Sequence, residues 1–170
     1  MSPEQPTTPT LAYLLLGSNL TDRAAMLRQA RTSLAANAGK IVAASRIYET
    51  APWGREDQPA YLNQAVAVRT LLSAEALLSA CLATERLAGR ERLERWGSRT
   101  LDVDILFYGD FILHSPTLTV PHPRVAERRF ALVPLAEIAP TLRHPQLHAT
   151  IGELLARCPD PLPVVLWPGT

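Results

Sequence analysis

Two aspartates separated by one residue, Asp102 and Asp104, lie in the otherwise apolar run 101–107. Residues i and i+2 of a strand face the same side, so both carboxylates are expected to project together. Aspartate is depleted in strands, and a divalent cation is one reason for a strand to carry two. Magnesium takes oxygen ligands, usually one or two carboxylates together with substrate phosphates. The pair therefore indicates a magnesium site, with a half-solvated strand face as the alternative.

The charged segment 89–99, which directly precedes the aspartates, is rich in arginine. It contains Arg90, Arg92, Arg95 and Arg99, together with Trp96. Guanidinium groups bind phosphate oxygens in pairs, and a loop with few apolar anchors can close over a substrate. The segment indicates a phosphate clamp. A solvated charged loop is the competing interpretation, because Glu91 and Glu94 nearly balance the charge.

Several other polar residues are candidates with weaker patterns. Asn63 has both a donor and an acceptor with which to read the edge of a heterocycle. His122 stands between two prolines and is a candidate phosphate ligand. His144 and His148 have the spacing of a zinc pair but no cysteine or glutamate partner at ligand spacing. Each of these also has a purely structural interpretation.

The composition limits the class of protein. The chain has 170 residues, is 47% hydrophobic and carries a formal net charge of +1, which gives no support to broad attraction to nucleic acid or membranes. Its single lysine and the lack of a G-x-x-x-x-G-K-[ST] run argue against a P-loop. Cys81 and Cys158 have no metal-ligand spacing, and a disulfide between them is left open. With no signal peptide and no membrane-spanning run, a cytoplasmic enzyme is expected.

The elements that must position these residues follow a repeated order. Strands are expected at 11–16, 41–48, 61–70 and 101–107, with helices after Asp22 and Ser73, a short hairpin near 115–116, helical segments at 126–138 and 151–158, and an irregular proline-rich end. Pro134 is expected to interrupt its helix or to begin a new one. Two strand-helix-strand halves predict an α+β, ferredoxin-like split βαβ fold: a mainly antiparallel sheet flanked by helices. Residues 1–10 are expected to be a mobile tail and 11–170 a single domain.

Four blocks occur in an order that is typical of one enzyme family. They are L-G-S-N over 16–19, Y-E-T-A-P-W-G through Q-P-A-Y-L-N over 48–63, R-W-G-S-R-T-L-D-V-D over 95–104, and V-P-H-P-R with R-R-F over 120–130. Together they resemble the 6-hydroxymethyl-7,8-dihydropterin pyrophosphokinase family, and the third block is the specific one. Three features depart from the family pattern: Ser98 and Ala51 replace common prolines, and the spacing from Gly89 to Trp96 is one residue shorter than in some members.

The resemblance implies transfer of pyrophosphate from ATP to the hydroxymethyl group of the pterin, giving AMP, in tetrahydrofolate biosynthesis. It implies catalytic roles for Arg90, Arg92, Asp102 and Asp104, the aspartates also holding two magnesium ions. It implies pterin binding by Thr50, Pro52, Trp53, Tyr61, Asn63 and Phe130, and ATP binding by Glu85, Arg95, Trp96, Arg99, Ile105, His122 and Arg128. The family expectation is a monomer that acts on small molecules, without nucleic acid or membrane partners.

Two other classes of protein remain as alternatives. A nucleic-acid-binding ferredoxin-like module would have a basic sheet face with paired aromatic residues, which the near-neutral charge and the two aspartates disfavour. A regulatory domain that binds nucleotide without catalysis is disfavoured by the aspartate pair and the arginine-rich segment. A turnover assay distinguishes both from an enzyme.

Overall fold

The computed structural model describes residues 6–20, 22–51, 59–89 and 101–169. The elements are, in chain order, β1 (Thr10–Ser18), α1 (Arg23–Asn37), β2 (Lys40–Ala44), β3 (Tyr48–Thr50), β4 (Tyr61–Thr70), α2 (Ala74–Leu87), β5 (Asp102–Tyr108), β6 (Leu113–His114), β7 (Thr119–Val120), the 3-10 helix η1 (Val125–Glu127), α3 (Arg129–Ile138), α4 (Ile151–Ala156) and β8 (Val164–Leu166). Both long helices begin as the sequence predicts. The side chains of Asp22 and Ser73 accept hydrogen bonds from the backbone N–H groups of Ala25 and Ala76.

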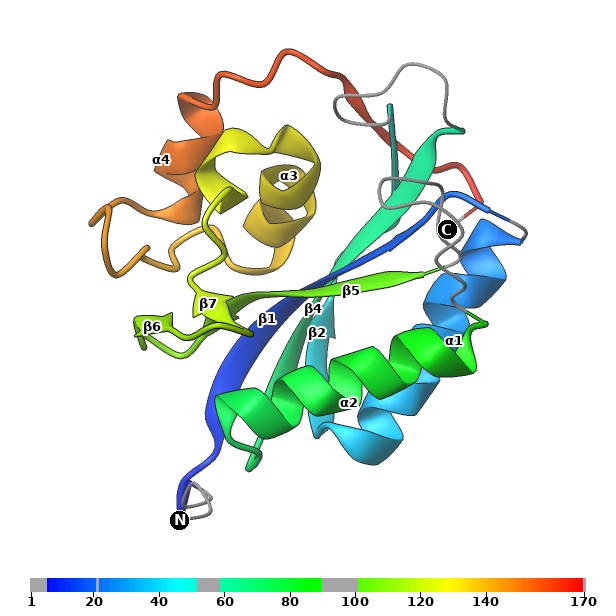
Figure 1. Cartoon of the computed structure of the whole chain (residues 1–170). Helices are drawn as coiled ribbons and strands as arrows, with labels where there is room; N and C mark the ends of the chain where they lie inside the picture. The colour runs from blue at the N-terminus through cyan, green and yellow to red at the C-terminus, as the bar shows by residue number, and fades with distance from the viewer. Residues whose placement is uncertain (1–5, 21, 52–58, 90–100, 170) are drawn as a thin grey trace.

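The main sheet has the strand order β5-β1-β4-β3-β8, and β2 also pairs with β4. Every ladder between the described strands is antiparallel. The units β1-α1-β2 and β4-α2-β5 are the two halves of a split βαβ arrangement, with β1 and β4 adjacent at the centre (Figure 1). The predicted α+β, ferredoxin-like fold is confirmed.

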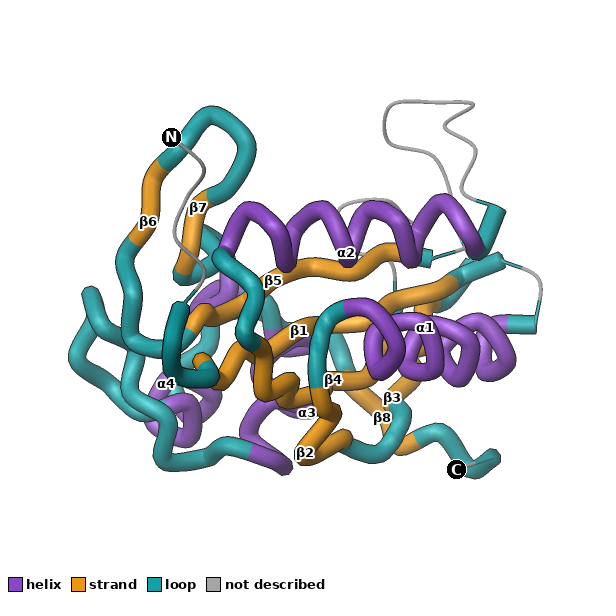
Figure 2. Tube along the Cα trace, turned by 90° about the horizontal axis from the view of Figure 1, so that it is seen from below, coloured by secondary structure: helices purple, strands orange, loops and turns teal. Residues whose placement is uncertain are grey.

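Helices cover both faces of the sheet, so that the molecule has three layers (Figures 1 and 2). Helices α1 and α2 cover one face, where they pack against Leu14 and Leu16 of β1. Helices α3 and α4 cover part of the other face, where they pack against Leu15. On β5, Val103 and Ile105 belong to the core under α1 and α2. Since side chains alternate along a strand, the two aspartates of β5 project from the α3 side.

Three details of the predicted elements are wrong. Thr10 belongs to β1 instead of the tail. The expected strand 41–48 is divided into β2 and β3, because buried Ser45 turns its polar groups toward β4: Ser45 Oγ accepts a hydrogen bond from Ala65 N at 3.0 Å, and its carbonyl accepts one from Gln64 Nε2 at 2.6 Å. Pro134 lies inside α3, which continues through it; the buried proline forgoes one backbone hydrogen bond.

The proline-rich end also contains a strand that the sequence analysis missed. Strand β8 pairs with β3 over three residues, from Thr50 opposite Val164 to Tyr48 opposite Leu166. Prolines on both sides of this short strand hide the pattern, but they do not interrupt the ladder itself, since 164–166 contains none. The C-terminal segment therefore extends the sheet beside β3.

Candidate active site

The two aspartates lie on β5, which forms one end of the strand order. Asp102 is opposite Gly17 of β1 and Asp104 is opposite Leu15, and both aspartates are partly exposed while Val103 between them is buried. Because of this alternation, both carboxylates lie on the same side of the sheet. Partly exposed carboxylates on one face are accessible to a cation.

A carboxylate on α2 holds the backbone of β5 between the aspartates. Glu85 is only 4% exposed, and its Oε1 accepts a hydrogen bond from the backbone N–H of Val103 at 2.9 Å. A helix residue thus satisfies a donor of the strand that forms one edge of the sheet among the described strands. Because Val103 separates Asp102 from Asp104, this bond fixes the strand from which both carboxylates project.

A row of residues runs across the sheet from Asp102. Its neighbour on β1 is Gly17, and the neighbour of Gly17 on β4 is Asn63. Asn63 is 3% exposed and donates through Nδ2 to Thr50 Oγ1 at 2.7 Å. A Cβ at Gly17 would lie 2.9 Å from Asn63 Oδ1 and 3.6 Å from Tyr61 Cδ1. Glycine in this position therefore leaves room for the Asn63 amide.

A third group of candidate residues comes from the segment after β7. The backbone N–H of His122 donates to Leu106 O of β5 at 2.9 Å, and His122 Nδ1 accepts from Arg124 N at 3.1 Å. Burial, with smaller contributions from the charges of Arg128 and Arg124, lowers the pKa of His122 to about 4. His122 is consequently neutral at physiological pH in the absence of ligands.

Arg128 interacts electrostatically both with this segment and with Asp104. Burial lowers its pKa and the charge of Asp104 opposes that shift, so the guanidinium and the carboxylate interact electrostatically. The Arg128 Cζ atom lies 5.6 Å from the centroid of the Phe130 ring. The start of α3 therefore brings a cation and an aromatic ring to the side of the sheet from which the aspartates project.

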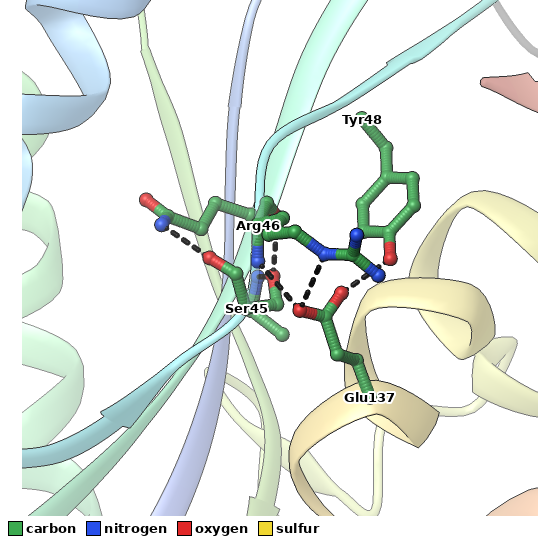
Figure 3. Close-up of polar contacts among 6 residues, drawn as sticks. Ser45, Arg46, Tyr48 and Glu137 are labelled. Atoms are coloured by element: carbon green, nitrogen blue, oxygen red, sulfur yellow. Dashed lines mark hydrogen bonds and ion pairs between the residues drawn. The ribbon is translucent and has the colours of Figure 1, made fainter. Parts of the chain in front are cut away.

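Helix α3 is fixed to the sheet by a cluster of polar contacts around Glu137 (Figure 3). The backbone N–H and Nε of Arg46 each donate to Glu137 Oε1 at 3.1 Å, and the Tyr48 hydroxyl donates to Oε2. Burial raises the pKa of Glu137, but the hydrogen bonds from Tyr48 and Arg46 outweigh it and give a net lowering. This cluster connects the helix that carries Phe130 to the strand that carries Thr50.

Ten of the site residues that the family resemblance implies lie in the described part of the chain. They are Thr50, Tyr61, Asn63, Glu85, Asp102, Asp104, Ile105, His122, Arg128 and Phe130. Among these, the side chain of Ile105 belongs to the core under α1 and α2. Pro52, Trp53, Arg90, Arg92, Arg95, Trp96 and Arg99 lie outside the described residues. Tyr48 and Glu137 were missed, since 89 residues separate them and neither has a local pattern that indicates the contact.

The buried histidine of the possible zinc pair, His144, makes structural contacts inside the protein. His144 is 5% exposed, its Nδ1 accepts from the backbone N–H groups of Gln146 and Leu147, and its ring packs edge-on against Phe107. In the described part of the chain, no three histidines, cysteines, aspartates or glutamates are grouped to hold a metal ion. The disulfide alternative is wrong, because Cys81 and Cys158 are free thiols that pack on opposite faces of the sheet.

Comparisons with known proteins identify the chain. The model of the family described as 7,8-dihydro-6-hydroxymethylpterin-pyrophosphokinase (HPPK) matches residues 13–140. A 2-amino-4-hydroxy-6-hydroxymethyldihydropteridine pyrophosphokinase of Methylorubrum extorquens is 51% identical over 134 residues, which cover 78% of this chain and 85% of that protein. One of the same name from Bacillus subtilis is 47% identical over 75% of this chain and 77% of that protein.

Solved structures agree on the fold. Plasmodium falciparum HPPK-DHPS, in a triple-mutant form, matches with a TM-score of 0.73 at 18% identity, over 91% of this chain and 44% of that longer chain. The wild-type protein with pterin and p-hydroxybenzoate also matches with a TM-score of 0.73, over 91% of this chain. This chain spans less than half the length of those chains.

Fold and relatives together define an α+β transferase of the kinase class with ATP as co-substrate. The chain belongs to the 7,8-dihydro-6-hydroxymethylpterin-pyrophosphokinase family. Its activity is transfer of pyrophosphate from ATP to the hydroxymethyl group of 6-hydroxymethyl-7,8-dihydropterin, which gives the pterin diphosphate and AMP in folate biosynthesis. Among the described residues, no helix is long and apolar enough to cross a membrane.

Proposed function

We propose that this reaction takes place on the side of the sheet that carries Asp102 and Asp104, and that these carboxylates hold two magnesium ions. The observation that supports the proposal is the row from Asp102 through Gly17 to Asn63, in which only strand β1 separates the carboxylate on β5 from the amide on β4. Two partly exposed carboxylates fit magnesium, which completes its coordination with substrate phosphates and water. The bound cations would neutralise triphosphate charge and align the attacked phosphorus.

The pterin is assigned to the Asn63 end of this row. Asn63 can pair with the edge of the ring through the amide groups that Thr50 does not use, and the hydrogen bond to Thr50 fixes the orientation of the amide. Tyr61 and Phe130 supply aromatic surfaces for the ring. Pro52 and Trp53 complete the pterin set by resemblance to the family.

The nucleotide is assigned to the Asp104 end. Arg128 interacts with Asp104 and would pair with phosphate oxygens. Neutral His122 can donate a hydrogen bond to a phosphate oxygen. Glu85 acts through the backbone between the aspartates. Family resemblance adds Arg95, Trp96, Arg99 and Ile105 to ATP binding, and Arg90 and Arg92 to stabilisation of charge that develops during transfer.

The protein contributes to the reaction mainly by positioning. Phosphoryl-type transfer requires the nucleophile, the attacked phosphorus and the leaving group to lie roughly in line. Asn63 and the aromatic pair orient the pterin hydroxyl toward the β-phosphorus, while the arginines fix the triphosphate and stabilise negative charge. The hydroxyl oxygen forms the new bond to phosphorus, its proton is released, and AMP leaves.

The same proposal covers the state of the protein in the cell. We infer a monomer in the cytoplasm, in which residues 10–170 act as one catalytic domain on small-molecule substrates, with no nucleic-acid or membrane partner. The formal net charge of +1 supports the exclusion of nucleic acid and membranes as partners.

Substitution of the two aspartates tests the proposed site. Asp102→Asn and Asp104→Asn keep the side-chain size but remove the charge, and each should reduce kcat by at least about a hundredfold and weaken the dependence on magnesium. Asp110→Asn, in the exposed turn after β5, is the matched control and should retain wild-type turnover. Chromatography of the nucleotide products identifies the reaction, since ADP in place of AMP would contradict pyrophosphoryl transfer. Wild-type kcat and magnesium dependence in both aspartate variants would refute the metal assignment.

A further inference from the structure

The C-terminal strand β8 lies beyond residues 13–140, which the family model matches, yet it contacts the strand that leads into the proposed pterin site. Strand β3 has only three residues, and it lies between β4 on one side and β8 on the other. Thr50 pairs with Tyr61 of β4 and with Val164 of β8. The ladder continues past Leu166, where Trp167 N donates to Ile47 O at 2.8 Å.

One guanidinium group connects this C-terminal segment to both ends of the segment 51–60. Arg23, the first residue of α1, has its Cζ 5.0 Å from the centroid of a Trp167 ring. Its Nη1 donates to Glu49 Oε2 at 2.8 Å, on the strand before this segment. The same nitrogen donates to Ala60 O at 2.9 Å, directly before β4.

The contacts of Arg23 with Trp167, Glu49 and Ala60 are together called the brace. The indole of Trp167 is half-buried against the core that α1 and α2 share, so it offers a fixed surface for the guanidinium. A cation over an indole ring contributes more where both groups are partly removed from water. The planar guanidinium keeps its several donors in one fixed geometry. Arg23, packed on Trp167, therefore adds side-chain contacts that join the end of β3 to the start of β4 beside the backbone pair of Thr50 and Tyr61.

We propose that Arg23 and Trp167 are positioning residues for the pterin substrate. The two strand ends that they hold carry Thr50 and Asn63, whose hydrogen bond orients the amide assigned to the pterin ring. Neither Arg23 nor Trp167 is assigned a contact with ATP or with the aspartates on β5, at the other end of the strand order. Loss of the brace should weaken pterin binding selectively. This inference rests on the proposed assignment of Asn63 to the pterin.

Steady-state kinetics on the full chain test the proposal. Trp167→Ala and Arg23→Gln each remove the stacked contact, while Trp167→Phe keeps an aromatic ring under the guanidinium. Arg28→Ala, on the exposed side of the same helix as Arg23, is the matched control. We expect the KM for hydroxymethyl-dihydropterin to rise about tenfold in the first two variants, because small displacements of positioning groups have effects of this size or larger. The KM for ATP should stay within about twofold in all four variants.

The KM values of these variants decide whether the brace positions the pterin. A pterin KM within about twofold of wild type in both Trp167→Ala and Arg23→Gln would overturn the proposal, as would a parallel rise in both KM values, which indicates general loss of structure. Recovery of the wild-type pterin KM in Trp167→Phe supports the stacked contact. Asn63→Ala is measured in the same series: an unchanged pterin KM in that variant refutes the assigned pterin site, whereas the Trp167 and Arg23 variants decide the brace.

Discussion

The substitution Gly17→Ala tests how the pterin end of the site is built. The added Cβ would lie 2.9 Å from Asn63 Oδ1, closer than such a contact allows, and 3.6 Å from Tyr61 Cδ1. The Asn63 amide must therefore move, and its 2.7 Å hydrogen bond to Thr50 is strained or lost. Overpacking of this kind costs about 1–3 kcal/mol, and an unsatisfied buried polar group costs a similar amount. We expect the free energy of unfolding to fall by about 1–3 kcal/mol.

The effect on binding should be selective for the pterin. Displacement of the amide that orients the ring is expected to raise the dissociation constant for hydroxymethyl-dihydropterin about 10- to 100-fold, which corresponds to roughly 1.4–2.8 kcal/mol. Titration calorimetry with pterin and a non-hydrolysable ATP analogue measures this, and urea denaturation measures the stability. Gly152→Ala in α4 is the control, because its Cβ would meet Pro140 O at 3.4 Å, far from the site in the fold. Wild-type pterin affinity in Gly17→Ala would refute the reasoning.

Three further substitutions test other parts of the site. Glu85→Ala leaves the Val103 N–H without its acceptor and should reduce kcat. It should also lower the free energy of unfolding, measured by urea denaturation, by about 1–3 kcal/mol. Glu85→Gln keeps an acceptor and should recover most of that stability. The pKa of His122 is about 4 in the folded protein, so the unfolded chain binds a proton more readily once the pH falls below the ordinary histidine pKa. The free energy of unfolding should therefore drop by about 2 kcal/mol between about pH 7 and about pH 5. The variant His122→Gln should lose this part of the pH dependence. Tyr48→Phe removes a hydrogen bond to Glu137 and should lower the free energy of unfolding by about 1 kcal/mol at neutral pH. Because the folded pKa of Glu137 is lowered, this loss should disappear in acid, once Glu137 is protonated. Equal losses at neutral and at acid pH would contradict this account.

The parts of the fold that the sequence predicts are those with local physical causes. Asp22 and Ser73 cap their helices through their own side chains, within three residues of the amides they bind. The apolar runs of β1 and β5 are long enough to mark buried strands, and the alternation in β5 places the aspartates together. The split βαβ order then follows from the sequence of elements, and it places the Gly17 end of β1 between the Asn63 end of β4 and the Asp102 end of β5.

The parts that the sequence does not predict depend on distant contacts. The division between β2 and β3 is made by Ser45, whose partners Gln64 and Ala65 lie about twenty residues away. Strand β8 exists because β3 offers it an edge, and three residues between prolines carry no pattern of their own. Glu137 finds Arg46 across 91 residues. Such contacts follow from the assembled fold, and local propensity does not reveal them.

The position of β1 at the centre of the sheet also bears on how the chain reaches its native state. Its apolar residues Leu14, Leu15 and Leu16 pair with β4, about fifty residues away, and with β5, about ninety residues away. During synthesis from the N-terminus, this strand emerges before both of its neighbours, and it can acquire the second one only after β5 has been made. Pairings of such long sequence separation slow folding and prolong the exposure of apolar strands. The strand that positions Gly17 therefore stays without its partners in the nascent chain until both β4 and β5 have been made.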